Sequence, residues 1–227
     1  MTVVVSNLTK RFRRGAETVT AVDDVSLVVN PGELTVAAGP SGSGKTTLLS
    51  IIAGFETPDA GSVRFDSPLP VGAEPLALTW RNLAFVPQAL ALLDELSVRE
   101  NVDLPALLDP AAPGGVPADD LLARLEIAHL AERYPSMTSG GEQQRTAVAR
   151  ALRLHPALLL GDEPTGHQDR ERIELVIELL REHAYGGNVV LISSHDEAVI
   201  AAADRVLTLA DGRLVSDRRA GTTRVPH

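Results

Sequence analysis

The chain has 227 residues, of which 44% are hydrophobic and none is cysteine, and its 21 Lys and Arg face 30 Asp and Glu. This length and apolar fraction predict a folded domain with a sizeable core, and the cysteine count excludes disulfides and thiolate metal sites. The formal net charge of −9 repels polyphosphate backbones, so we expect no nucleic-acid partner. The absence of cysteine also fits a reducing cytoplasm, and no export signal is visible. Because no apolar run approaches the ~20 residues that span a bilayer, a role at a membrane would need a separate spanning protein.

Short strands are predicted over most of the first 88 residues. The strand-like runs are TVVVSNL, TAVDDVSLVVN, GSVRFDS and LAFVPQ, the last of which ends at Gln88. Between them, LTVAA is short and apolar and precedes a glycine, which predicts a strand buried on both faces.

Helices are predicted from Leu90 to about Ala151. In this region DLLARLEIAHLAERY has leucines at 121, 122, 125 and 130, a spacing near three and four that favours a helix. The preceding DPAAPGGVPADD is a Pro/Gly-rich surface loop. Strand and helix then alternate again in PALLLGDEP, DRERIELVIELLREHA and NVVLISSH, and a DG pair predicts a hairpin in DRVLTLADGRLVSD.

This order predicts an α/β fold with a mostly parallel sheet and helices on both faces, because parallel strands need helical crossovers. We expect one domain over residues 1–227, with residues 1–88 and 152–227 forming the core and an antiparallel β subdomain. Residues 89–151 would form an inserted helical subdomain, and residues 217–227 a flexible tail.

The glycine-rich turn GPSGSGKTT matches the phosphate-loop pattern G-x-x-x-x-G-K-[ST]. Glycines allow successive N–H groups to point at phosphate oxygens, and the helix that follows adds the positive end of its dipole. The expected nucleotide-binding residues of this turn are Gly39, Pro40, Ser41, Gly42, Ser43, Gly44, Lys45, Thr46 and Thr47. Lys45 would contact the outer phosphates of ATP, and the Thr46 hydroxyl would bind Mg²⁺.

Two acids end the strand-like run ALLLGDEP. Asp162 is placed to hold Mg²⁺, and Glu163, one residue further, is the candidate general base for the water that attacks the γ-phosphate. Gln88 and His195 also end strand-like runs, and the carboxyl ends of parallel strands share one edge of a sheet. Gln88 would contact the metal or the attacking water, and His195 the γ-phosphate, although polar residues at strand ends are often simple caps.

The segment MTSGGEQQRTAVARAL, together with the phosphate loop upstream and LLLGDEPTG downstream, resembles the nucleotide-binding domain of ABC transporters. The resemblance covers nearly the whole chain in one order. It also implies an adenine-stacking role for Phe12, whose other interpretation is a core residue, and a nucleotide contact for Asp169. In this family, two subunits pair head to tail, so the signature residues Ser139, Gly140, Gly141 and Glu142 would close over ATP held by the partner.

Within the family, the chain is most similar to subunits that serve lipoprotein release, macrolide export and FtsX-like permeases. The resemblance therefore implies an ATP-dependent homodimer, peripheral on the inner face of the cell membrane, that drives a separate integral-membrane permease. The permease would dock beside the glutamine loop on ALALLDELSVRENVDLPALL, whose leucines also suit a plain core.

The chain departs from the family pattern at a few positions. Thr138 stands where leucine is usual, Glu142 where glutamine is commonest, and His167 and Gln168 where the family has Asn-Leu or Ala-Leu. We expect the glutamine to alter contacts across the dimer seam. Three alternatives remain. One is a mechanotransmission ATPase partnered with an FtsX-like permease. The second is a soluble ABC-type ATPase that acts on nucleic acid or the ribosome, which the acidic balance disfavours, and the third is a phosphate-loop kinase, which would not explain the signature.

Overall fold

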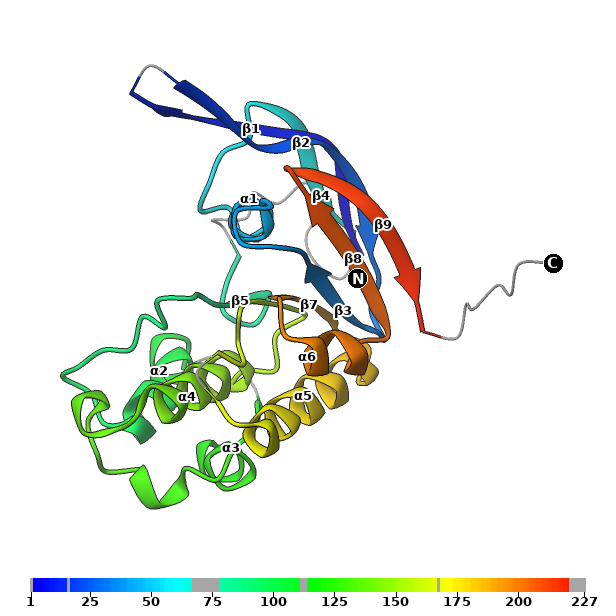
Figure 1. The fold of residues 1–227 in the computed structure, drawn as a ribbon. Helices are drawn as coiled ribbons and strands as arrows, with labels where there is room; N and C mark the ends of the chain where they lie inside the picture. Colours follow the sequence, from blue (N-terminus) through cyan, green and yellow to red (C-terminus); the bar gives the residue numbers. More distant parts are fainter. Residues whose placement is uncertain (1, 16, 67–77, 111–113, 167, 221–227) are drawn as a thin grey trace.

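The computed structural model describes residues 2–15, 17–66, 78–110, 114–166 and 168–220, which form two sheets and six α-helices (Figure 1). The larger sheet has the order β5-β6-β7-β3-β8-β9, parallel except for the β8–β9 hairpin. Its strands are β3 (Leu34–Ala38), β5 (Leu83–Val86), β6 (Leu158–Asp162), β7 (Val189–Ser194), β8 (Arg205–Ala210) and β9 (Arg213–Arg219). The smaller, antiparallel sheet consists of β1 (Val3–Arg14), β2 (Glu17–Val29) and β4 (Ala60–Phe65).

Helices cover both faces of the larger sheet. The helix α1 (Lys45–Ile52) packs between the two sheets, whereas α5 (Arg170–Tyr185) and α6 (Glu197–Ala202) lie on the opposite face (Figure 1). Since successive side chains of a strand point to opposite faces, Leu158 and Leu160 enter the core with α1, and Leu159 enters the core with α5. The predicted α/β fold with a parallel sheet and an antiparallel β subdomain is therefore confirmed.

Three helices form the predicted helical region: α2 (Val98–Leu108), α3 (Ala118–Arg124) and α4 (Gly140–Leu152). One buried cluster joins them to β3, β5, β6 and β7. The division of the chain at residues 88 and 152 thus remains a prediction about subdomains. Within the described residues, every helix is too short or too polar to cross a bilayer.

Two local predictions were wrong. The run expected as one helix ends at Arg124, because Glu126 adopts a left-handed φ of 55°, and only a short 3-10 turn, Ala128–Leu130, follows. The flexible tail was predicted to begin at residue 217, but β9 continues to Arg219. Residues 221–227 of that tail lie outside the described residues.

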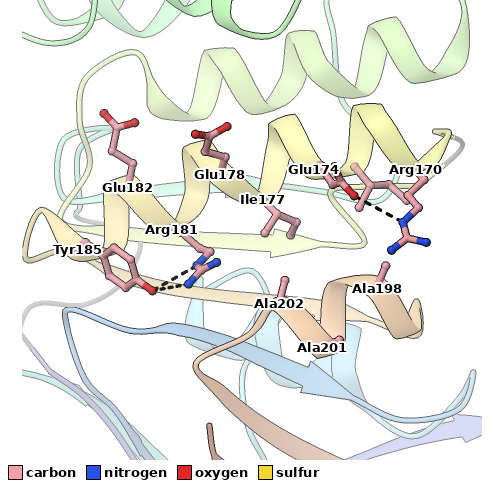
Figure 2. Close-up of a pocket in the computed structure, with 11 residues that line it drawn as sticks. Arg170, Glu174, Ile177, Glu178, Arg181, Glu182, Tyr185, Ala198, Ala201 and Ala202 are labelled. Atoms are coloured by element: carbon pink, nitrogen blue, oxygen red, sulfur yellow. Dashed lines mark hydrogen bonds and ion pairs between the residues drawn. The ribbon is translucent and has the colours of Figure 1, made fainter. Parts of the chain in front are cut away.

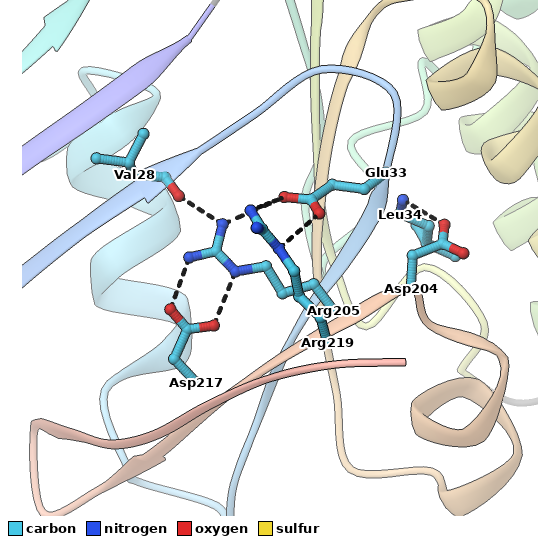
Figure 3. Close-up of polar contacts among 7 residues, drawn as sticks. All are labelled: Val28, Glu33, Leu34, Asp204, Arg205, Asp217 and Arg219. Atoms are coloured by element: carbon cyan, nitrogen blue, oxygen red, sulfur yellow. Dashed lines mark hydrogen bonds and ion pairs between the residues drawn. The ribbon is translucent and has the colours of Figure 1, made fainter. Parts of the chain in front are cut away.

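A buried guanidinium explains why β9 continues past residue 217 instead of ending there. Figure 3 shows the Arg205 side chain between Glu33, Asp217 and the Val28 carbonyl. Its Nε and Nη2 donate to the two carboxylate oxygens of Asp217 at 2.8 and 2.7 Å, and its Nη1 donates to Val28 at 2.6 Å and to Glu33 at 3.2 Å. The bidentate pair raises the pKa of Arg205, lowers that of Asp217 and ties β9 to β2 and β8.

We expect the buried side chain of His183 to make the fold less stable in acid. Its ring is buried on α5, with Nε2 2.9 Å from the carbonyl oxygen of Pro156, and burial, aided by the neighbouring His155, lowers its pKa to about 4. An unfolded histidine has a pKa near 6.5, so the unfolded state binds more protons as the pH falls from 6.5 to 4. We therefore expect this residue alone to cost up to ~3 kcal/mol of the free energy of unfolding across that window.

Urea unfolding of the wild type and of His183→Gln, which keeps a donor for Pro156, at pH 7 and pH 4.5 measures this effect. The variant should lose less stability on acidification than the wild type. Equal losses in the two proteins would contradict the assignment.

Candidate nucleotide site

Predicted site residues lie at or just after the ends of four neighbouring parallel strands. Gly39 follows β3, Asp162 ends β6, His195 follows β7, and Gln88 lies two residues after β5. Because these strands are consecutive in the order β5-β6-β7-β3 and all run parallel, their carboxyl ends lie at one edge of the sheet. The predicted strand end at Gln88 is two residues late, since β5 ends at Val86, before Pro87, which has no N–H for the ladder.

The phosphate loop has a backbone that only glycine accommodates at two of its positions. Gly39 and Gly44 have φ values of 146° and 101°. A Cβ on Gly39 would lie 2.2 Å from the carbonyl oxygen of Leu209, and a Cβ on Gly44 would lie 2.2 Å from that of Ala21. The turn therefore packs directly against β8 and β2, and Gly44 forms the N-cap of α1.

The polar groups of this loop fit a polyphosphate. Lys45 is buried, and its Nζ donates to the carbonyl oxygens of Gly39 at 2.7 Å and Pro40 at 3.0 Å. The buried hydroxyl of Ser43 has no hydrogen-bond partner among the described residues. Phosphate oxygens would offer acceptors to both groups at the start of α1, and the Thr46 side chain is exposed beside them. Pro40, Ser41 and Gly42 complete the turn, and Thr47 follows in α1.

The predicted metal carboxylate and general base are joined to their neighbours by hydrogen bonds. Asp162 is buried, and its Oδ1 accepts from the hydroxyl of Ser193 at 2.6 Å. Glu163 adopts a left-handed φ of 52°, and its Oε1 lies 2.8 Å from Nδ1 of His195, whose ring is largely exposed. The structure thus brings Asp162, Glu163 and His195 together, and it adds Ser193, which the motifs did not indicate.

The loop after Gln88 is held by an arginine that the sequence analysis missed. Leu90 and Ala91 have left-handed φ values of 53° and 48°, which are unfavourable for both residue types. Their carbonyl oxygens accept from Nη2 and Nη1 of Arg150 in α4, at 2.7 and 2.6 Å. Burial lowers the pKa of this guanidinium. Arg150 therefore links the helix of the signature to the glutamine loop, while Gln88 itself is exposed.

The signature residues begin α4 in a capping box. The Glu142 N–H donates to Ser139 Oγ at 3.4 Å, and the Ser139 N–H donates to Glu142 Oε2 at 2.7 Å, which lowers the pKa of Glu142. Gly140 and Gly141 form the first turn. The unusual Thr138 hydroxyl donates to the Pro135 carbonyl at 2.8 Å. Since α4 packs in the cluster opposite α1, the signature and the phosphate loop belong to different faces of the sheet (Figure 1).

The segment after the acidic strand contacts the signature helix of its own chain. Gln168 accepts from Nη1 of Arg145 at 3.3 Å, and Asp169 caps α5 by accepting the N–H of Arg172 at 3.0 Å. His167 lies outside the described residues. The expected effect of Gln168 on a dimer seam remains a prediction, and the structure gives this residue a contact within one chain.

Phe12 lies on β1 and is 37% exposed, so it is not a core residue. The ammonium of Lys10 lies 5.2 Å from the centre of its ring. A partly exposed aromatic face is compatible with the predicted adenine contact.

A separate groove of about 840 Å³ lies between α5 and α6 (Figure 2). Ile177, Ala198 and Ala202 line it, with Arg170 and Glu174 paired at one end and Arg181 and Tyr185 at the other. None of the predicted site residues lines this groove.

Comparisons with known proteins agree with this geometry. Residues 22–166 match the family described as ABC transporter. An uncharacterised ABC transporter ATP-binding protein of Mycobacterium bovis is 39% identical over 98% of this chain and 69% of its own length. The macrolide export ATP-binding/permease protein MacB of Burkholderia thailandensis is 40% identical over 94% of this chain and 33% of its own length.

Solved structures give the same result. The ATP-binding cassette MJ0796, a dimer in a post-hydrolysis state bound to ADP and Pi, is 30% identical with a TM-score of 0.83 over 96% of this chain and 98% of that one. A nucleotide-free cassette from an ABC transporter is 26% identical with a TM-score of 0.77, over 96% of this chain and 91% of that one. The phosphate loop, the acidic strand end and these matches together establish that the chain belongs to the ABC transporter family, as an ATP-binding cassette with ATPase activity.

Proposed function

We propose that this chain works as a head-to-tail homodimer that closes on two Mg-ATP molecules and drives a separate membrane permease. The observation that carries the proposal is the convergence of Lys45, Asp162, Glu163 and His195 at one sheet edge. The signature at Ser139 starts a helix packed on the other face of the sheet. A second subunit would supply the signature to this edge.

Each residue of the edge has a task in hydrolysis. Lys45 and the loop amides would hold the phosphates. The Thr46 hydroxyl, Asp162 and Gln88 are the candidate ligands for magnesium, which would neutralise part of the negative charge of the phosphates. Glu163 would accept the proton of the attacking water, and His195, in contact with its Oε1, would orient that carboxylate and contact the γ-phosphate.

The partner's signature would complete the site. The N–H groups of Gly140 and Gly141 at the start of α4 are oriented along the helix and meet anionic oxygen favourably. Loss of the γ-phosphate on hydrolysis would remove this bridge and open the dimer.

A permease partner is supported by relatives and by exposed apolar surface. MacB carries, by its name, an ATP-binding and a permease part in one protein, and this chain covers a third of it. Beside the glutamine loop, a groove of about 600 Å³ is lined by Phe55, Trp80, Phe85 and Ala91, and Phe55 is 62% exposed. Leu107 and Leu108 of α2 are also exposed, so the 89–108 segment is only partly core. We propose export of lipoprotein-, peptide- or macrolide-type substrates as the task.

Hydrolysis by Ser139→Arg tests the two-subunit site. If the partner's signature completes each site, the variant should bind ATP like the wild type and hydrolyse it at least ~100-fold more slowly. The hydrolysis rate of the wild type should rise more than linearly with protein concentration, because two subunits are needed for each site. Ser136→Arg, at an exposed residue three positions earlier, serves as control and should hydrolyse normally. Normal hydrolysis by Ser139→Arg would contradict the proposal.

A further inference from the structure

Ser193 is a fully buried serine whose hydroxyl contacts both acidic residues of the site, the carboxylate of Asp162 and the backbone of Glu163. It lies on β7, directly opposite Asp162 of β6 in the parallel register, and has no exposed surface. A buried hydroxyl in the centre of a sheet is costly unless it is hydrogen-bonded. The partners of this hydroxyl are therefore informative.

The two bonds of the hydroxyl have fixed directions. Its oxygen lies 3.0 Å from the backbone nitrogen of Glu163, and since an amide only donates, the hydroxyl is the acceptor there. Its single proton is then free for Oδ1 of Asp162, 2.6 Å away, a distance typical of a charge-assisted bond to a carboxylate. One hydroxyl thus connects the predicted metal ligand and the backbone of the predicted base.

We propose that Ser193 is a positioning residue for the metal: it fixes the rotation of the Asp162 carboxylate so that Oδ2 is the oxygen offered to Mg²⁺. Among the hydrogen bonds of the described residues, Asp162 uses Oδ1 alone. Without the serine proton, the carboxylate would rotate more freely. Binding of Mg²⁺ would then have to order the carboxylate, which would lower the affinity for the ion. The inference rests on the proposed Mg-ATP site.

The second bond supports the base. Glu163 has a left-handed φ of 52°, a conformation that is unfavourable for a residue other than glycine. The bond from its N–H to Ser193 helps to hold this backbone, which directs the side chain toward His195. Ser193 therefore supports the metal ligand through its proton and the base through its lone pair.

The next residue offers a matched control. Ser194 is also fully buried on β7, but its hydroxyl accepts the N–H of Asp196 at 3.1 Å, in the turn to α6. Ser194→Ala removes the same atom from the same strand and leaves Asp162 untouched. A difference between the two variants therefore reports the two bonds of Ser193, to Asp162 and from Glu163, rather than the loss of a buried hydroxyl as such.

The experiment compares the affinity for a non-hydrolysable ATP analogue in Mg²⁺ with that in EDTA; their ratio is the magnesium gain. We expect Ser193→Ala to reduce this gain about tenfold or more, the usual effect of removing a partner of a metal ligand, and to leave the affinity in EDTA within about twofold. Ser193→Thr, which keeps the hydroxyl, should restore the gain, and Ser194→Ala should retain it. Ser193→Cys, similar in volume and a weak donor, replaces the alanine variant if that protein does not fold, with the same expected loss.

Three other results would overturn the proposal, and they are distinguishable. A wild-type magnesium gain in Ser193→Ala, or an equal loss in Ser194→Ala, would mean that Ser193 serves the sheet alone. A wild-type protein that binds the analogue in neither solution would instead refute the proposed function, and the role of Ser193 with it.

Discussion

Replacing Glu163 by glutamine is expected to lower kcat by ~10² to 10⁴, because the amide cannot accept the proton of the attacking water. The change keeps the size of the side chain, and its Oε1 can still accept a hydrogen bond from Nδ1 of His195, which is 2.8 Å away in the wild type. The phosphate loop is not altered. ATP affinity should therefore stay close to that of the wild type, and steady-state phosphate release measures the loss.

Glu197→Gln is the matched control for this prediction. Glu197 is an exposed carboxylate in the first turn of α6, two residues after His195. Its replacement removes the same charge near the same edge and should leave kcat unchanged. A Glu163→Gln rate within threefold of the wild type would show that another group accepts the proton.

Gly44→Ala is expected to lower the free energy of unfolding by more than ~3 kcal/mol and to abolish nucleotide binding. The residue has a φ of 101°, and its new Cβ would lie 2.2 Å from the backbone oxygen of Ala21. Because that oxygen belongs to the main chain of β2, no side-chain rotation relieves the contact. The strained conformation adds its own cost, of the order of 1–3 kcal/mol.

Gly42→Ala separates the two costs. Gly42 also has a positive φ, 81°, but a Cβ there would meet nothing within 4 Å. In urea unfolding without nucleotide, the Gly42→Ala variant should lose only the conformational part of the penalty, about 1–2 kcal/mol. Equal losses for Gly42→Ala and Gly44→Ala would contradict the close packing of the loop against β2.

The local motifs were sufficient to predict the main groups of the site. Lys45, Asp162 and Glu163 lie where their motifs placed them, because each motif encodes its own strand end and turn. The parallel fold followed from the alternation of strands and helices, and it brought Gln88 and His195 to the same edge.

Contacts between distant segments could not be predicted in this way. The bond from Ser193 to Asp162 joins residues 31 positions apart, and Arg150 reaches Leu90 over 60 positions. Both depend on which strands and helices pack side by side. The broken helix at Glu126 shows that a local pattern can also mislead. The leucine spacing continues past Glu126, although the backbone of that residue has already left the helical conformation.

The solution mass of Glu163→Gln, measured by light scattering with and without Mg-ATP, tests the central claim most directly. Loss of the base should trap the ATP-bound state, so we predict a monomer without nucleotide and a dimer with Mg-ATP, and no dimer when Ser139→Arg is added. A mass that does not respond to Mg-ATP, although the nucleotide is shown to bind, would contradict the account of two subunits that close over shared ATP.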